Sequence, residues 1–161
     1  GRLADATRYL VNALFGKYGL VIVDGNDASF KIQFKEIFKK DVFDQIPFQT
    51  VEKSIGELKT LGYHAQVNPR EINCFLLAPQ TRSRIEKKGD HFSVAGTDHP
   101  MNRDELRSLI EDKPEKISPN VTLRPVYQQY ILPNIAYTGG PGELAYWLEY
   151  KHMFETLAVF F

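Results

Sequence analysis

Hydrophobic residues recur at helical spacing over several parts of this 161-residue chain. The spacing predicts helices over residues 3–16, 30–42, 48–61, 101–112, 120–132 and 142–157. Asp27, Asn102 and Asn120 stand just before three of these segments, where a side-chain cap is expected. Pro125 falls in the first turn of its helix, where proline is tolerated because the N–H that it lacks has no helical partner there.

Other stretches have the pattern of strands. Leu20–Val23 is a continuous apolar run closed by turn residues, which is typical of a buried strand in a parallel sheet. Residues 135–138 and the apolar end, 157–161, are also predicted to be strands. Residues 64–67, 73–79, 82–89 and 91–96 form shorter strand patterns, and Gly89-Asp90 between the last two predicts a hairpin.

The order of these elements favours a single α/β domain over residues 1–161. Helices and strands alternate at both ends of the chain, which is typical of a layered fold with a mostly parallel sheet. Residues 64–97 add a small antiparallel β patch, either an insertion or an edge meander. Two segments that lead from a strand through a turn into a helix remain, around Asp24 and around Gly139. Ligands of open α/β sheets bind at such strand ends.

Composition narrows the class of protein. Lys and Arg total 20, as do Asp and Glu, so the chain lacks the basic surplus of a nucleic-acid binder. The absence of a long apolar run excludes a membrane span, and the N-terminus has no signal-peptide pattern. A single cysteine, Cys74, cannot form an intramolecular disulfide and is expected to be a buried thiol in a cytoplasmic protein. The apolar end at 157–161 and the initial Gly1 suggest a fragment of a longer protein.

Candidate chemistry centres on the glycine turn, Gly139-Gly140-Pro141-Gly142, between a predicted strand and a predicted helix. Glycines let backbone N–H groups approach a ligand, and a helix N-terminus favours an anion. Glu143 directly after the turn would repel an anion, so an amine is an equally suitable ligand. The pattern alone leaves a binding site and a tight connector as equal alternatives.

Polar residues outside the glycine turn offer further candidates. Asp24 and Asn26 end the first predicted strand and suit hydroxyls or an amine, although a turn with a helix cap explains them as well. Arg124 stands among apolar residues and suits a carboxylate or phosphate, or else a structural salt bridge. The histidines show no metal-binding spacing, so no metal site is predicted; they are His64, His91, His99 and His152.

Two stretches of the sequence carry a resemblance to a known family. "SPNVTLRPVYQQYILPNIAYTGGPGELAYWLEYKHMFE", residues 118–155, closely resembles the bacillithiol biosynthesis cysteine-adding enzyme family, and "LFGKYGLVIVDGND", residues 14–27, looks like a second segment of it. Together they cover about a third of the chain. The resemblance implies a Rossmann-like core with inserted segments and a C-terminal coiled coil that makes the full-length protein a homodimer.

The resemblance also implies a reaction and substrates. The family is assigned the last step of bacillithiol synthesis, in which the carboxyl of cysteine is joined to the amine of glucosaminyl malate. Amide formation needs an activated carboxyl, so a nucleotide, ATP or another, is the implied cofactor, through an acyl-adenylate or acyl-phosphate. The chain is too short for the whole enzyme, and the N-terminal part of the core and the C-terminal coiled coil are expected to be missing from it. We expect this piece alone to be inactive. The alternative is a non-catalytic α/β scaffold or ligand-binding domain of a larger protein.

The resemblance gives the candidate residues expected roles. The backbone of Gly139, Gly140 and Gly142 is expected to approach the substrate, while Glu143 holds or deprotonates the incoming amine as the catalytic residue. Asp24 and Asn26 are expected to bind hydroxyls or an ammonium group. Asn120 and Arg124 are expected to take a carboxylate of malate or cysteine.

Overall fold

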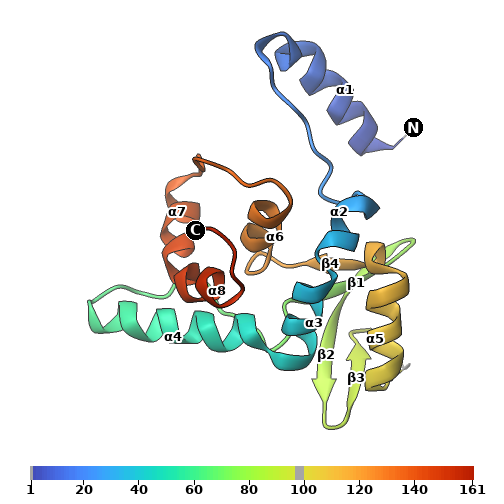
Figure 1. The fold of residues 1–161 in the computed structure, drawn as a ribbon, viewed down its shortest axis with the longest axis vertical. Helices are drawn as coiled ribbons and strands as arrows, with labels where there is room; N and C mark the ends of the chain where they lie inside the picture. The colour runs from blue at the N-terminus through green and yellow to red at the C-terminus, as the bar shows by residue number, and fades with distance from the viewer. Residues whose placement is uncertain (1, 97–99) are drawn as a thin grey trace.

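The computed structural model describes residues 2–96 and 100–161, which form helices around one small sheet (Figure 1). The α-helices are α1 (Leu3–Phe15), α2 (Ala28–Gln33), α3 (Lys35–Asp44), α4 (Ile46–Thr60), α5 (Arg103–Asp112), α6 (Arg124–Ile131), α7 (Pro141–Trp147) and α8 (Lys151–Thr156). Short 3-10 turns are η1 (Gly16–Tyr18), η2 (Pro114–Lys116) and η3 (Leu148–Tyr150). The strands are β1 (Cys74–Ala78), β2 (Thr81–Lys88), β3 (His91–Val94) and β4 (Ile117–Pro119).

The sheet is antiparallel and has the strand order β3-β2-β1-β4. The predicted hairpin joins β2 to β3, with Gly89 at φ 59°, a left-handed conformation that glycine adopts without strain. Phe75 of β1 lies opposite Arg84 of β2 and Ser118 of β4, so these three residues share one face. The other face carries buried apolar side chains, such as Ile85 and Ile117, toward the core.

The prediction of a mostly parallel sheet is wrong for the described part of the chain. Residues 20–23 are extended but pair with no strand among the described residues, and Val21 is 80% exposed. Residues 135–138 and 157–161 also lie outside the sheet, and so do residues 64–67. An apolar run indicates a strand only where a neighbouring backbone accepts its hydrogen bonds. Here β1 already has β2 on one side and β4 on the other.

The core lies between the sheet and the helices. Phe34, Ile37, Phe38 and Val42 form the buried stripe that the sequence pattern predicted, although a break at Phe34 divides the predicted helix into α2 and α3. Farther along the chain, the predicted helix over 142–157 is divided by η3 into α7 and α8, and α8 packs against α4. One continuous apolar cluster joins these helices to the sheet.

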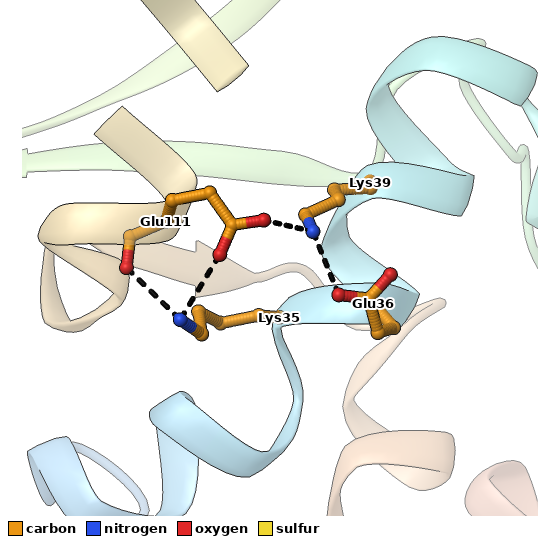
Figure 2. A network of polar contacts seen from close by, with 4 residues as sticks. All are labelled: Lys35, Glu36, Lys39 and Glu111. Atoms are coloured by element: carbon orange, nitrogen blue, oxygen red, sulfur yellow. Dashed lines mark hydrogen bonds and ion pairs between the residues drawn. The ribbon is translucent and has the colours of Figure 1, made fainter. Parts of the chain in front are cut away.

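A network of ion pairs ties α3 to α5 at the protein surface. Figure 2 shows Glu111 of α5 between two lysines of α3: Lys35 Nζ lies 3.0 Å from one carboxylate oxygen, and Lys39 contacts the other. Lys39 also bonds Glu36 at 2.7 Å. These partly exposed pairs each contribute about 1 kcal/mol or less, so they orient α5 more than they stabilise the fold.

Helix α1 extends away from the rest of the molecule and is followed by an extended segment (Figure 1). None of its residues is buried, so the predicted apolar stripe of this helix has no cover within the described chain; Leu3 and Tyr9, for example, are exposed. Among the described residues, no helix combines the length and the apolar character that crossing a bilayer requires.

Candidate binding cavity

A cavity of about 830 Å³ lies where the extended segment 21–26 meets β4 and α6. This volume is within the range of small-molecule sites. The cavity is lined by polar and apolar side chains from distant parts of the chain. Four of the predicted site residues are among them: Asp24, Asn26, Asn120 and Arg124.

The segment around Asp24 forms a tight turn that contacts α6. The N–H of Asn26 donates to Asp24 Oδ1 at 2.9 Å, which folds the turn locally. The hydroxyl of Tyr127 donates to the carbonyl of Gly25 at 2.8 Å and fixes the turn against α6. Asp27 caps α2 as predicted, because its Oδ1 accepts from the N–H of Ser29 at 2.9 Å. The turn and cap interpretation is therefore confirmed, and the same turn also lines the cavity.

Asn120 holds the start of α6 beside the cavity. Its Oδ1 accepts from the N–H groups of Thr122 and Leu123 at 2.9 and 3.1 Å, and its carbonyl accepts from the N–H of Arg124 at 2.9 Å. The predicted capping role is thus observed in the turn that leads into α6. Since Asn120 also donates from Nδ2 to Asn73 at 3.0 Å, its amide is firmly oriented. Arg124 follows as the first residue of α6 and is exposed.

Behind Asn120 lies a fully buried polar network. Asn73 donates to both carboxylate oxygens of Asp41, from its backbone N–H at 2.7 Å and from Nδ2 at 3.0 Å. Burial raises the pKa of Asp41 to about 6, because an apolar interior disfavours the charged form. Burial also raises the pKa of the Cys74 thiol well above its usual value, and the neighbouring Asp41 carboxylate adds to this shift. Cys74 is therefore the buried, unreactive thiol that the sequence predicted.

Two cations of the cavity were not among the predicted site residues. Lys31 of α2 is only 1% exposed, and its Nζ donates to Asn26 Oδ1 at 2.6 Å and to the carbonyl of Glu115 at 2.9 Å. Arg82 of β2 donates to the carbonyl of Pro119 at 2.9 Å. A signal for Lys31 exists in the sequence: it shares the helical face of Phe34 and Phe38, so a cation stands on an apolar stripe.

The glycine turn lies outside the lining of this cavity. Glu143 Oε2 accepts from the N–H of Gly140 at 3.1 Å, which closes the N-terminus of α7 locally. Tyr137 stacks on Trp147 with ring centroids 4.2 Å apart, beside the turn. The structure therefore does not bring Gly139, Gly140, Gly142 or Glu143 together with the four cavity residues. Burial raises the pKa of Tyr137 and of Tyr146 next to the turn, and the charge of Arg124 partly offsets the shift.

The histidines of the described residues belong to no candidate metal cluster. His152 contacts Glu57 at 2.8 Å and Glu155 at 3.2 Å on the surface, whereas His99 lies outside the described residues. Within residues 2–96 and 100–161, no group of three or more His, Cys, Asp or Glu side chains has an arrangement suited to a metal ion.

Comparison with known proteins gives one consistent result. A family model described as "Bacillithiol biosynthesis BshC, N-terminal Rossmann-like domain" matches residues 1–161. Proteins named "Putative cysteine ligase BshC" are 44% identical over 158 residues in Cytophaga hutchinsonii and 46% identical over 159 residues in Flavobacterium johnsoniae. The counterpart in Flavobacterium psychrophilum is 50% identical over 153 residues.

These alignments cover nearly all of this chain but little of each relative. They include 98% and 99% of the chain for the first two proteins, yet only 30% of the length of each. The chain therefore spans about a third of the relatives that it matches. The family description of a Rossmann-like domain agrees with a mixed α/β fold, whereas the sheet that the described residues form is antiparallel.

Proposed function

Because the chain belongs to the BshC family of bacillithiol biosynthesis, we propose that it forms part of the substrate site of a cysteine ligase. The reaction is the joining of the cysteine carboxyl to the amine of glucosaminyl malate. The observation that carries the proposal is the cavity, which gathers Asp24, Asn26, Asn120 and Arg124 from two separate stretches of the chain.

The cavity offers complementary groups for the two substrates. The guanidinium of Arg124 suits a carboxylate, since its planar donors match two carboxylate oxygens at once. The Asp24 carboxylate suits an ammonium or a hydroxyl, and its Oδ1 is held in place by the Asn26 N–H. Because the amide of Asn120 is already engaged with α6 and Asn73, its role is to position Arg124. Glu143 is proposed to accept the proton of the incoming amine, from outside the cavity lining.

Amide formation from a free carboxylate requires activation, and a nucleotide would supply it by making the carboxyl oxygen a good leaving group. The cavity has cationic side chains that suit nucleotide phosphates, among them Arg124. The tasks of this chain's residues are then to bind and orient the carboxylate and the amine. The complete protein is proposed to act in the cytoplasm as a homodimer.

The test is an activity assay of the full-length protein with cysteine, glucosaminyl malate and a nucleotide. Amide product should form, and the Arg124→Lys variant should raise the KM of the carboxylate substrate roughly 10- to 100-fold, since a charged hydrogen bond contributes about 1.5–3 kcal/mol. Glu143→Gln keeps an oxygen that can accept from the Gly140 N–H, so it should lower kcat without unfolding α7. Unaltered KM in Arg124→Lys, or unaltered kcat in Glu143→Gln, would contradict the respective role.

A further inference from the structure

The charges around the cavity are unequal. Lys31, Arg82 and Arg124 contribute three cations from α2, β2 and α6, whereas Asp24 is the one acidic side chain among the lining residues. Within the described part of the chain, none of the three cations forms an ion pair with a carboxylate. The lining of the cavity therefore carries a surplus of positive charge that no ion pair of the described residues neutralises.

The burial of Lys31 is the part of this charge surplus that points to an anionic ligand. An ammonium group has three N–H donors, and the described acceptors of Lys31, Asn26 Oδ1 and the Glu115 carbonyl, use two of them. Both acceptors are uncharged groups, and the Glu115 and Asp24 carboxylates favour the charged form of Lys31 without forming an ion pair with it. Burying a cation without a close counter-charge is expensive. Such an arrangement suits an anion that arrives as a ligand.

Arg82 makes several contacts beside the cavity. Its guanidinium lies 3.9 Å from the centroid of the Phe75 ring, donates to the Pro119 carbonyl at 2.9 Å and reaches Ser118 Oγ at 3.3 Å. Burial lowers the pKa of Arg82, and the charges of Arg124 and Arg84 lower it further. Arg82 and Arg124 both line the cavity, and an anion bound between them would offset the repulsion of their charges.

We propose that Lys31, Arg82 and Arg124 form a subsite for a dianionic group with oxygen acceptors, either a phosphoryl group or a pair of carboxylates. The proposal rests on the cavity's assignment above as the substrate site, and it adds the class of group bound and two residues that bind it. Three cations against one carboxylate leave two positive charges, so a dianion fits the cavity better than a monoanion such as acetate. The planar forks of Arg82 and Arg124 match the several oxygens of such a group.

The experiment is a calorimetric titration of the full-length protein with malate, inorganic phosphate and ADP, with acetate as the monoanion. At least one dianion should bind 10-fold or more tightly than acetate. Binding of malate but not of phosphate or ADP identifies the dicarboxylate as the source, and the reverse identifies the phosphoryl group. If no dianion binds more tightly than acetate, the proposal is overturned.

Variants locate the binding. Lys31→Met keeps the length of the side chain without its charge, and Arg82→Gln alters an exposed side chain; each should weaken dianion binding 10-fold or more. Lys88→Gln removes a cation from the exposed far end of the same strand β2 and should leave binding unchanged. Equal weakening in Lys88→Gln, or none in both cavity variants, overturns the subsite. Should Lys31→Met not fold, Arg82→Gln alone decides.

The subsite and the ligase proposal can fail separately. Loss of dianion binding in the cavity variants of a protein that makes no amide product supports the subsite and refutes the reaction. The opposite outcome is a protein that forms the amide product while both variants bind the dianion as tightly as the wild type. It refutes the subsite and supports the reaction.

Discussion

The turn around Asp24 and the turn around Gly139–Gly142 both lead from an extended segment into a helix, but they satisfy their polar groups over different distances along the chain. At the first turn, Gly25 bonds Tyr127 of α6, and Asn26 bonds Lys31, which in turn reaches the Glu115 carbonyl. At the second turn, Glu143 closes back on Gly140, only three residues away. The first turn is thus fixed by the tertiary structure, while the second is fixed by its own sequence.

This difference bears on where a ligand site can be pre-organised. Groups that are held by distant segments keep their geometry when a ligand arrives, which lowers the entropy lost on binding. A turn that closes on itself needs no distant partner and folds in the same way in many contexts. The comparison favours the cavity beside Asp24 as the binding site, and three experiments can break or sharpen it.

The largest expected effect concerns the buried network behind the cavity. Asn73→Ala removes the Nδ2 donor to Asp41 and the Oδ1 acceptor for Asn120 Nδ2, and leaves a buried carboxylate poorly bonded. The backbone N–H of residue 73 and the Cys74 thiol remain as donors to Asp41. We expect a loss of about 3–5 kcal/mol of unfolding free energy. Urea unfolding measures it. A control, Asn68→Ala, alters an exposed asparagine nearby and should have little effect.

The same network predicts a pH effect. Since the pKa of Asp41 is raised to about 6 in the folded state, the folded protein holds a proton that the unfolded chain has lost between about pH 4 and 6. The stability from this group is present below the unfolded pKa and is lost as pH rises through about 6. The measurement compares the unfolding free energy of the wild type with that of an Asp41→Asn variant between about pH 4 and 6. If the wild type does not lose stability relative to the variant over this range, the raised pKa of Asp41 is contradicted.

Sequence patterns predicted the parts of the fold that depend on neighbouring residues. Asn102 caps α5 with a full capping box to Glu105, and Gly89 forms the predicted hairpin. The prediction was wrong where the outcome depends on a distant partner. Leu20–Val23 has the composition of a buried strand, but no strand of the described residues lies beside it. Strand β4 was not predicted, because a segment of three residues that ends in Pro119 shows no strand pattern.

The candidate site divides in the same way. Asp24 and Asn120 were identified as turn and cap residues at element ends, and these are the positions that border the cavity. Lys31 was missed because it stands inside a helix, where a lysine usually faces solvent. Arg82 was missed because a pattern of alternating residues does not reveal that β4 runs beside β1 and brings Ser118 and Pro119 to the same cavity.

The second experiment uses the pH dependence of Lys31. Burial lowers its pKa to about 8, so its charge is lost at a pH where ordinary lysines keep theirs. Glu115 and Asp24 favour the charged form, as does Cys74, whereas Arg82 disfavours it. Dianion affinity measured by calorimetry should fall above pH 8 by up to about tenfold per pH unit, and the fall should be absent in Lys31→Met.

The unfolding free energy should rise with pH, whereas the dianion affinity should fall. Between about pH 8 and 10.5 the unfolded chain binds the proton that folded Lys31 has released, so unfolding free energy from this group rises with pH. Comparing wild type with Lys31→Met by urea unfolding isolates the contribution. Affinity and stability that fall together would show that Lys31 has a structural role and that the cavity does not use its charge.

The smallest expected effects distinguish the glycines of the second turn. At Gly139 an added Cβ would lie 2.7 Å from Tyr137 Cε1 and 3.2 Å from Glu143 Cβ, so Gly139→Ala should displace the ring stacked on Trp147 and cost about 1 kcal/mol. At Gly142 nothing lies within 4 Å, so Gly142→Ala should stabilise α7 by about 0.5–1 kcal/mol through helix propensity. Thermal unfolding of both variants measures this contrast.

Activity of the full-length Gly142→Ala variant then decides what the turn does. A more stable protein with unchanged kcat and KM would show that the turn is a connector, as its local hydrogen bonding suggests. A more stable protein with reduced activity would show that a substrate approaches the backbone at a position where the described chain leaves open space. In that case the site extends from the cavity to the glycine turn, with Arg124, whose charge reaches Tyr137 and Tyr146, between the two.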